Sequence, residues 1–420
     1  MKVGASLGAQ VGEMISRPEL HIVSEEPAFS WTDSLVESLR SIEYLRGACG
    51  HCVLSPALAL RLRYRAFSNA SIAAALSHRR LMRAVEVARC IGSSERTESP
   101  VEQEFRNYWR GLNRLEEAVD CSHELTEQYI QEVNRTVLSR GPGIRGTKNP
   151  YRITERPGAD SSSPACSLAV PHPPQISGMM RDLFQWWSSR TAKELPAPVA
   201  AAIFSYVFAR IQPFNNGNRQ TARLAATSAL WLSGYYMNGW WSFAGHVFSP
   251  GDRFYEELVQ SSQSSSEDLY ELPDYTDWLD YFVGGLGASA REMSKLLERV
   301  DHKSCRSELA WTKLSRSEHQ VLNRCLARKL SRDDDHTVIS SRHLQIWFSL
   351  SYGAATTRLE EWLEQSFIVP APSGIGGSER LYTIDPRWQD VITEASEMEL
   401  PEEDLRSSVE DSLFGTCASL

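Results

Sequence analysis

The chain has no long apolar run and no excess of positive charge. No apolar stretch in its 420 residues approaches the ~20 that a membrane-spanning helix needs. Near the N-terminus, polar and small residues up to Glu13 interrupt any signal-like apolar core. The net charge of −9 excludes a global basic field that would recruit nucleic acid or a membrane surface. These features predict a soluble, cytoplasmic protein that does not bind membranes.

Paired cysteine motifs are almost absent, because the eight cysteines are mostly scattered. The one close pair is Cys49-Gly50-His51-Cys52, a tetrapeptide that disulfide isomerases use in their active sites. That chemistry needs a strand before the motif and a helix after it. Here a helical pattern over 31–45 precedes it, so we expect no redox role. A structural zinc site is equally disfavoured, because no second Cys-x-x-Cys follows.

What the chain does contain is helical periodicity along most of its length. The expected helices before residue 301 span 31–45, 56–67, 72–90, 100–119, 126–138, 176–189, 196–211, 219–232, 275–286 and 289–300. The stretch 145–166 is rich in proline, serine and glycine and is expected to hold a short hairpin and a loop, and 261–267 is a serine-rich linker.

The C-terminal part has a different pattern. Helices are expected over 318–329, 342–348 and 354–366, followed by strands at 367–369 and 381–384 around a glycine-rich turn at 373–378. Three helices and a hairpin are typical of a winged helix. Its third helix carries Arg358 but also three glutamates, which repel phosphates, and Arg342 and Arg380 add only a thin basic edge. We therefore expect a protein or dimer contact rather than DNA reading. Acidic residues then predict a disordered tail.

The most informative segment reads Gln212-Pro213-Phe214-Asn215-Asn216-Gly217-Asn218-Arg219-Gln220-Thr221-Ala222-Arg223. It resembles the signature His-Pro-Phe-x-Asp/Glu-Gly-Asn-Gly-Arg-x-x-Arg of the Fic (Fido) family. Members of that family transfer a nucleotide monophosphate, usually AMP from ATP, to a protein hydroxyl. An ungapped comparison keeps the spacing of the two arginine positions, and we prefer it.

The resemblance implies that Gln212 stands where the family has its catalytic histidine. Imidazole accepts a proton near neutral pH, whereas a carboxamide does not, so Gln212 cannot act as general base. Asn216 stands at the position of the family's carboxylate, which binds Mg²⁺. It offers one neutral oxygen to a cation that prefers anionic ones.

The remaining motif positions imply a phosphate-binding turn at the start of a helix. Gly217 and Asn218 retain the family's residues, and Arg223 stands at the last arginine. Arg219 occupies the second glycine position, where its side chain would obstruct close approach of a phosphate. Gln220 replaces the first arginine.

Other segments resemble this family in the same order. Before the motif these are Leu125-Thr126, Pro142-Gly143-Ile144-Arg145 and Val170-Pro171-His172-Pro173-Pro174; after it come Tyr255 and the run from Asp277 to Phe282. Many Fic proteins also carry an inhibitory helix, Ser-Ser-x-Ile-Glu-Gly, whose glutamate pairs with the first arginine. The matching stretch here is 69–74, with Ala73 in place of the glutamate. Because Gln220 replaces the arginine, both halves of that ion pair are missing. His172 and His246 are considered as replacement bases, and a structural or surface role is favoured for both.

The expected fold is mainly α: a Fic helical fold with a small β-hairpin flap, plus a C-terminal winged helix. The expected divisions are a flexible arm 1–28, a helical region 29–120, a Fic core 121–300, a winged helix 315–390 and an acidic tail 391–420. The expected function is that of a family member whose adenylyltransferase activity is lost or altered and which binds a ligand or a partner. Alternatives are an active transferase with an atypical motif and a DNA-binding regulator. The implied cofactor is ATP or another nucleotide with Mg²⁺, and the implied partners are a protein or a second copy of the chain.

Overall fold

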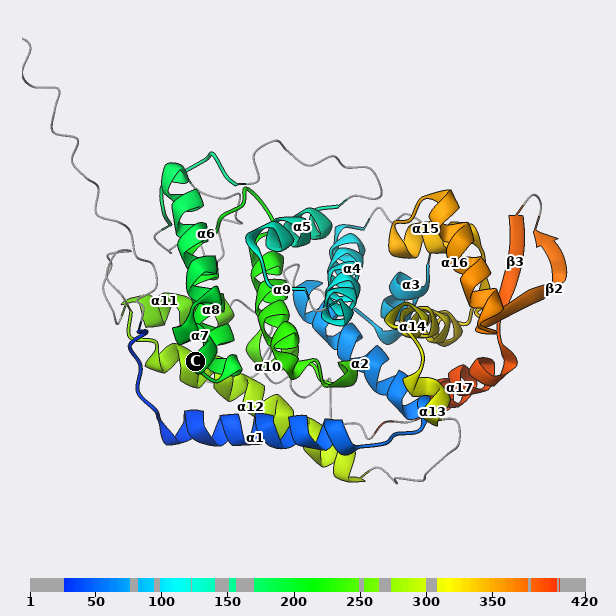
Figure 1. The fold of residues 1–420 in the computed structure, drawn as a ribbon, viewed down its shortest axis with the longest axis horizontal. Helices are drawn as coiled ribbons and strands as arrows, with labels where there is room; N and C mark the ends of the chain where they lie inside the picture. The colour runs from blue at the N-terminus through cyan, green and yellow to red at the C-terminus, as the bar shows by residue number, and fades with distance from the viewer. Residues whose placement is uncertain are drawn as a thin grey trace, which may run out of the picture.

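The computed structural model describes residues 26–75, 82–93, 99–121, 123–139, 151–155, 170–248, 253–263, 273–299, 308–376, 379–398 and 400. The described chain is mainly helical with one small antiparallel sheet, as the sequence predicts (Figure 1). Among these residues, no helix is both long enough and apolar enough to cross a membrane. Several expected features lie outside the described residues: most of the N-terminal arm, the segment 142–145, most of the flap, and the tail from 401 onward.

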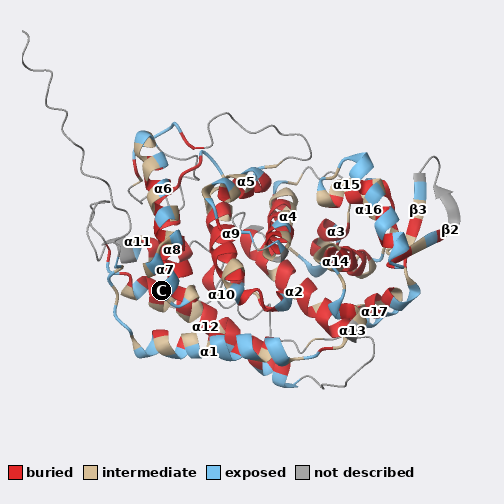
Figure 2. Cartoon of the chain, in the orientation of Figure 1, coloured by how far each residue is buried: buried red, intermediate tan, exposed pale blue. Residues whose placement is uncertain are grey.

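Helix α8 (Ala197–Ile211) forms the centre of the larger part of the molecule. Nearly every one of its side chains is buried, because its sequence is apolar on all sides. Helix α9 (Asn218–Leu230) packs beside it, and both are mostly red in Figure 2. The surrounding helices are α2 (Pro56–Ala75), α4 (Pro100–Asp120), α5 (Glu127–Val137), α6 (Pro173–Ser188), α7 (Arg190–Glu194), α10 (Ala244–Val247) and α11 (Arg253–Gln263).

Local signals in the sequence explain where several helices begin. Ser99 caps α4 by accepting a bond from the backbone N–H of Glu102, and Pro100 occupies its first turn. Thr126 caps α5 in the same way, with the backbone N–H of Tyr129 as donor at 3.2 Å. These caps place α4 and α5, which frame the motif segment described below, close to where the sequence predicts them.

Helices α1 (Asp33–His51) and α12 (Thr276–Arg299) lie side by side along one edge of the molecule (Figure 1). The sequence predicts two helices where α12 runs without a break, so that prediction is wrong. Gly287 allows the continuity, since it lies against α1: a Cβ there would be 2.7 Å from the Cα of Ser38. Gly287 is thus a point of close contact between α1 and α12.

Two other helix predictions need correction. The single helix expected over 72–90 is divided, because α2 ends at Ala75 and α3 spans Ala84–Gly92. The helix expected to reach Leu232 ends at Leu230 and continues as a π-helical turn, η3 (Trp231–Tyr235), and a 3₁₀ turn, η4 (Met237–Gly239). Gly234 has a φ of 91°, which a regular helix cannot contain.

The C-terminal unit, residues 308–398, begins with α13 (Glu308–Thr312) and α14 (Arg316–Leu330). Strand β1 (Val338–Ile339), α15 (Ser341–Phe348), α16 (Tyr352–Glu364), β2 (Ile368–Gly376), β3 (Glu379–Ile384) and α17 (Pro386–Glu397) follow. The three strands form an antiparallel sheet in the order β1-β3-β2. The sequence predicts the hairpin but misses β1, which is only two residues long. It also predicts tail where α17 continues from 391 to 397, so the expected boundary is wrong there.

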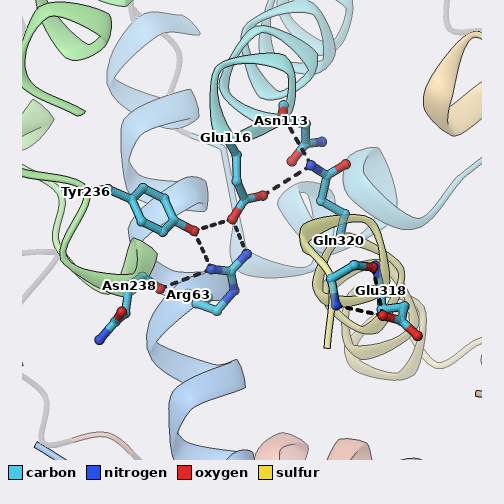
Figure 3. Close-up of polar contacts among 8 residues, drawn as sticks. Arg63, Asn113, Glu116, Tyr236, Asn238, Glu318 and Gln320 are labelled. Atoms are coloured by element: carbon cyan, nitrogen blue, oxygen red, sulfur yellow. Dashed lines mark hydrogen bonds and ion pairs between the residues drawn. The ribbon is translucent and has the colours of Figure 1, made fainter. Parts of the chain in front are cut away.

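The C-terminal unit is packed onto the helical core rather than tethered to it. Helix α14 contacts α2, α3 and α4, and α17 contacts α2. At this contact lies a buried group of polar side chains, the junction network: Arg63, Glu116, Tyr236, Asn238 and Gln320 (Figure 3).

The junction network satisfies its charges internally. The Arg63 guanidinium donates to the Glu116 carboxylate, to the hydroxyl of Tyr236 at 2.5 Å and to the backbone carbonyl of Asn238 at 3.0 Å. Gln320 Nε2 of α14 donates to the second Glu116 oxygen at 3.1 Å. Arg63 and Glu116 are 2% and 0% exposed. The network therefore links α2, α4 and η4 to the C-terminal unit.

Candidate functional site

The motif segment, residues 212–223, lies where α8 ends and α9 begins. Gln212 ends α8 in the left-handed conformation with a φ of 45°. This conformation costs a residue other than glycine free energy and is typical of constrained positions. Gln212 is 4% exposed, and its carboxamide Nε2 has no hydrogen-bond partner among the described residues. The position expected for a general base therefore holds a buried carboxamide whose Nε2 lacks a hydrogen-bond partner among the described residues.

An arginine that the sequence analysis did not single out holds Gln212 in place. Arg152 is 1% exposed and donates from Nε to the Gln212 carbonyl oxygen at 2.9 Å. Its other nitrogens donate to the carbonyl oxygens of Pro171, Thr154 and Glu155. Burial lowers the pKa of Arg152, and Glu155 partly opposes this effect. Arg152 thus ties segment 151–155 and the residue before His172 to the start of the motif segment.

The turn between the helices is held by two asparagines. The Asn218 amide accepts from the Phe214 N–H at 2.9 Å and donates to the Phe214 carbonyl at 2.7 Å. Asn134 of α5 donates to the Asn216 carbonyl and to the Thr221 hydroxyl, each at 3.0 Å. Asn134 is a further residue that the sequence analysis missed, because a single polar residue on an amphipathic helix resembles a solvated one.

Gly217 has the conformation that the turn requires. Its φ is 75°, and a Cβ at this position would lie 3.0 Å from Cδ2 of Leu138. The two expected phosphate-binding residues, Gly217 and Asn218, thus form the turn that opens α9. The side chain of Asn216, the expected metal position, is exposed beside it.

The two arginine positions of the motif segment differ in what they contact. Gln220 donates from Nε2 to a carboxylate oxygen of Glu104 on α4. Arg223 is 3% exposed and donates to the backbone carbonyl of Ala73 at 2.6 Å and to that of Phe248 at 3.4 Å. Its guanidinium carbon also lies 5.2 Å from the centre of the Phe248 ring. Burial, and secondarily Arg219, lowers the pKa of Arg223 to about 10.

These contacts change the expected relation between Ala73 and the motif. The sequence analysis relates Ala73 to Gln220, but the structure places the Ala73 carbonyl on Arg223 and Gln220 on Glu104. Helix α2 therefore reaches the motif segment at its last arginine. Arg219 is half-buried, with its guanidinium carbon 6.0 Å from the centre of the Tyr255 ring.

The two histidines considered as replacement bases both have acidic partners. His172 contacts Glu155 at 2.8 Å, and both side chains are exposed. His246 contacts Glu292 at 2.9 Å, and this hydrogen bond lowers the pKa of the Glu292 carboxyl. Each contact is a side-chain hydrogen bond between a histidine and a glutamate.

The close cysteine pair does not have the arrangement of a redox site. Cys49 and His51 lie in the last turn of α1, and Cys52 caps that helix, so a helix rather than a strand precedes the pair. Burial, and secondarily Cys52, raises the pKa of the Cys49 thiol to about 12, which keeps it unreactive. Within the part of the chain that the structure describes, no group of three or more His, Cys, Asp or Glu residues could hold a metal ion.

Comparison with known proteins shows which family the helices around the motif segment resemble. The sequence profile of the Fic/DOC family matches residues 124–230, which run from just before α5 to the end of α9. No curated protein matches the chain at a significant level.

The solved structures that resemble the chain include Fic proteins. A Fic family protein from Desulfovibrio desulfuricans G20 has 16% sequence identity and a TM-score of 0.47, over 86% of this chain and 98% of that one. A Fic domain containing signaling protein from Bacteroides thetaiotaomicron VPI-5482 has 19% identity and a TM-score of 0.49, over 62% and 96%. A fragment of Fic-1 from C. elegans has 20% identity and a TM-score of 0.40, over 62% and 71%. On the profile match, residues 124–230 form a Fic/DOC family domain.

Proposed function

We propose that this protein uses its Fic domain to bind a partner and does not transfer nucleotides. The observation that carries the proposal is Gln212, which stands at the position of the family's general base. A carboxamide cannot take a proton from a target hydroxyl near neutral pH. Loss of a general base alone removes about 10²–10⁴-fold in rate.

The surroundings of the motif segment support the same proposal. Asn216 supplies no negative charge for Mg²⁺. Gln220 is engaged by Glu104, so the first arginine position presents an amide beside a carboxylate. That carboxylate would repel a phosphate group at the start of α9. Arg223, which would have to reach the ligand, is directed to the backbone of Ala73 and Phe248.

The turn itself is nevertheless well supported, by Asn218, Asn134 and Gly217. Exposed residues surround it: Asn215 and Asn216 on the turn, Ile153 at 73% exposure and Leu138 at 43%. Two exposed aliphatic side chains beside amide groups suit a protein contact better than a metal–phosphate complex. We infer that this rim is where the Fic domain meets a protein target or a second copy of the chain.

The C-terminal unit has the helix and strand order of a winged helix, and we propose that it also contacts protein rather than DNA. Arg358 is the basic residue of α16, the third helix of the expected winged helix. It forms an ion pair with Glu361 at 3.1 Å and donates to the Ser317 hydroxyl at 3.1 Å. It is therefore directed along α16 and toward α14. Binding to genomic DNA fragments at physiological salt should stay in the non-specific range of about 10⁻⁴–10⁻⁶ M. Nanomolar, sequence-specific binding that Arg358→Ala abolishes would contradict this.

The central experiment measures transfer of labelled AMP from ATP by the full chain with Mg²⁺, together with ATP binding by calorimetry with and without Mg²⁺. We expect no transfer and no Mg²⁺-dependent binding. Labelling that disappears on Gln212→Ala would overturn the proposal.

A repair series separates the contributions of the individual positions. Gln212→His alone should stay inactive. The combination Gln212→His, Asn216→Asp, Arg219→Gly and Gln220→Arg restores the family residues, but Glu104 would then face the new arginine and pair with it. We therefore expect more transfer when Glu104→Gln is added. If Gln212→His alone equals the combined variants, the other positions do not matter.

A further inference from the structure

A second group of charged residues lies away from the motif segment, where α4 meets the C-terminal unit. Arg106, Arg110 and Arg114 follow one another at intervals of four along α4, which places them on one face of that helix. Arg324 of α14 lies close enough to Arg106 and Arg110 for their charges to act on it. We call these four residues the arginine cluster.

Arg324 is the most enclosed member of the cluster. It is 5% exposed, and one terminal nitrogen donates to the Ile91 carbonyl of α3 at 2.8 Å. Its guanidinium carbon lies 5.4 Å from the centre of the Trp347 ring on α15. The Nε atom of Arg324 is buried with no hydrogen-bond partner among the described residues. Burying a charged group with an unpaired N–H donor lowers the stability of the folded state. A bound ligand that accepts a hydrogen bond from this donor would remove that cost.

Two further members of the cluster, Arg110 and Arg114, donate hydrogen bonds to neutral groups. Arg110 donates to the Asn107 side-chain oxygen at 3.1 Å, and Arg114 to the Thr136 hydroxyl at 2.9 Å. Arg106 contacts the Cys90 thiol of α3. Among the residues that the structure describes, no ion pair joins Arg110, Arg114 or Arg324 to a carboxylate.

Nearby carboxylates are mostly engaged elsewhere. Glu102 pairs with Arg89 at 2.9 Å, and Glu116 is held in the junction network. Glu117 lies near Arg114 and Arg358; burial raises the pKa of its carboxyl, and the charges of these two arginines lower it. Burial together with the neighbouring arginines lowers the pKa of Arg110, and lowers that of Arg324 to about 9. The cluster thus concentrates positive charge inside a chain whose net charge is −9.

We propose that the arginine cluster binds a compact phosphoryl anion, either inorganic phosphate or the phosphate group of a small monoester. Guanidinium groups bind phosphate oxygens through paired hydrogen bonds, and the cluster draws them from α4 and α14, two helices that contact each other. The enclosure of Arg324 and the acidic chain favour a small dianion over an extended polyanion. Because the members come from α4 and α14, the bound anion would connect the helical core to the C-terminal unit. This site is independent of the motif segment and of the function proposed above.

The test is thermal unfolding of the full chain in increasing inorganic phosphate, at constant ionic strength maintained with chloride. We expect a saturable rise in Tm, because a ligand that binds only the folded state stabilises it. Calorimetry with inorganic phosphate gives the Kd, and glucose 6-phosphate in a parallel titration distinguishes free phosphate from a monoester.

Two variants of the half-buried members, Arg110→Gln and Arg106→Gln, should weaken phosphate binding about tenfold or more, since each removes a charge-assisted hydrogen bond. Arg110→Gln should also raise the Tm in the absence of phosphate, because it relieves repulsion on Arg324. A merely structural arginine would lower it. Arg135→Gln is the matched control, since Arg135 is exposed on the neighbouring helix α5.

Asn216→Ala distinguishes this site from the start of α9 and should leave phosphate binding unchanged. The proposal is overturned if phosphate and chloride act alike, or if Arg110→Gln leaves phosphate binding unaltered. It is also overturned if duplex DNA binds at the cluster while phosphate and glucose 6-phosphate do not.

Discussion

Two buried arginines, Arg63 in the junction network and Arg223 in the motif segment, are equally inaccessible but have opposite surroundings. Burial alone would lower the pKa of Arg63, but Glu116 and Tyr236 outweigh it and raise that pKa. Among the described residues, the hydrogen bonds of Arg223 go to backbone carbonyls, and burial lowers its pKa to about 10. A buried charge with its counter-ion serves the fold. A buried charge without a counter-ion lowers the stability of the fold, and such charges are typical of functional sites.

The same contrast extends to the residues around each arginine. In the junction network both carboxylate oxygens of Glu116 have donors, and the donors come from three separate segments. In the motif segment, Gln212 keeps an unpaired buried amide. Both places keep a buried nitrogen without a partner among the described residues, Nε of Arg63 and Nε2 of Gln212, so the difference lies in the carboxylate that pairs with the charge of Arg63.

The largest effect is expected from breaking the junction network. Arg63→Ala should lower the free energy of unfolding by about 3–5 kcal/mol, because it leaves the buried Glu116 without its cation. Urea unfolding of the full chain measures this. Arg46→Ala is the control: Arg46 forms an exposed pair with Glu43 at 2.6 Å, for which a loss below about 1 kcal/mol is expected. Equal losses in the two variants would show that Arg63 is not structurally central.

The next effect concerns the turn of the motif segment. Gly217→Ala should cost about 1–3 kcal/mol, because a left-handed conformation is unfavourable for alanine and its Cβ would crowd Leu138. Gly178→Ala in α6 is the control, since a Cβ there meets nothing within 4 Å and helix propensity predicts a gain of up to about 1 kcal/mol. Differential scanning calorimetry compares the two. A neutral Gly217→Ala would indicate that the turn adjusts freely.

A pH dependence follows from His319 of α14, beside the junction network. Both ring nitrogens are buried, and the ring lies against Trp311, with 4.4 Å between the two ring centres and the Trp311 backbone also acting on His319. Burial, and then Arg63 and Arg316, lowers its pKa well below 6.5. Below pH about 6.5 the unfolded chain therefore binds a proton that the folded chain does not, and stability falls as the pH falls.

The expected slope is about 1.4 kcal/mol per pH unit from His319. His319→Phe should reduce this slope of the free energy of unfolding against pH, as measured by urea unfolding between pH 7 and 5. A residual slope of the same sign should remain, because burial also lowers the pKa of His336. An unchanged slope in His319→Phe would assign the acid sensitivity to other groups.

Much of the fold is predictable from the sequence, because helical periodicity and caps such as Ser99 and Thr126 are local signals. The motif segment is also found from the sequence, since its residues are contiguous. What the sequence cannot provide is the partner of each polar residue. Glu104, Asn134 and Arg152 meet the motif segment from distant positions, and each resembles an ordinary solvated residue in its own helix or loop. The contact of Gly287 with α1 is likewise invisible in the sequence.

The smallest effect, and the sharpest comparison, comes from replacing each buried arginine by methionine, which keeps most of the apolar length. Arg63→Met leaves Glu116 buried and unpaired, so the loss should approach that of Arg63→Ala. Arg223→Met removes the hydrogen bonds to the Ala73 and Phe248 carbonyls, while it also removes a charge that burial already disfavours. These effects oppose each other, so the net change should stay within about 1–2 kcal/mol. Urea unfolding of both variants at one pH measures the difference directly. A loss for Arg223→Met as large as that for Arg63→Met would mean that the Ala73 and Phe248 carbonyls stabilise the guanidinium as well as a carboxylate does, and Arg223 would then be a structural residue.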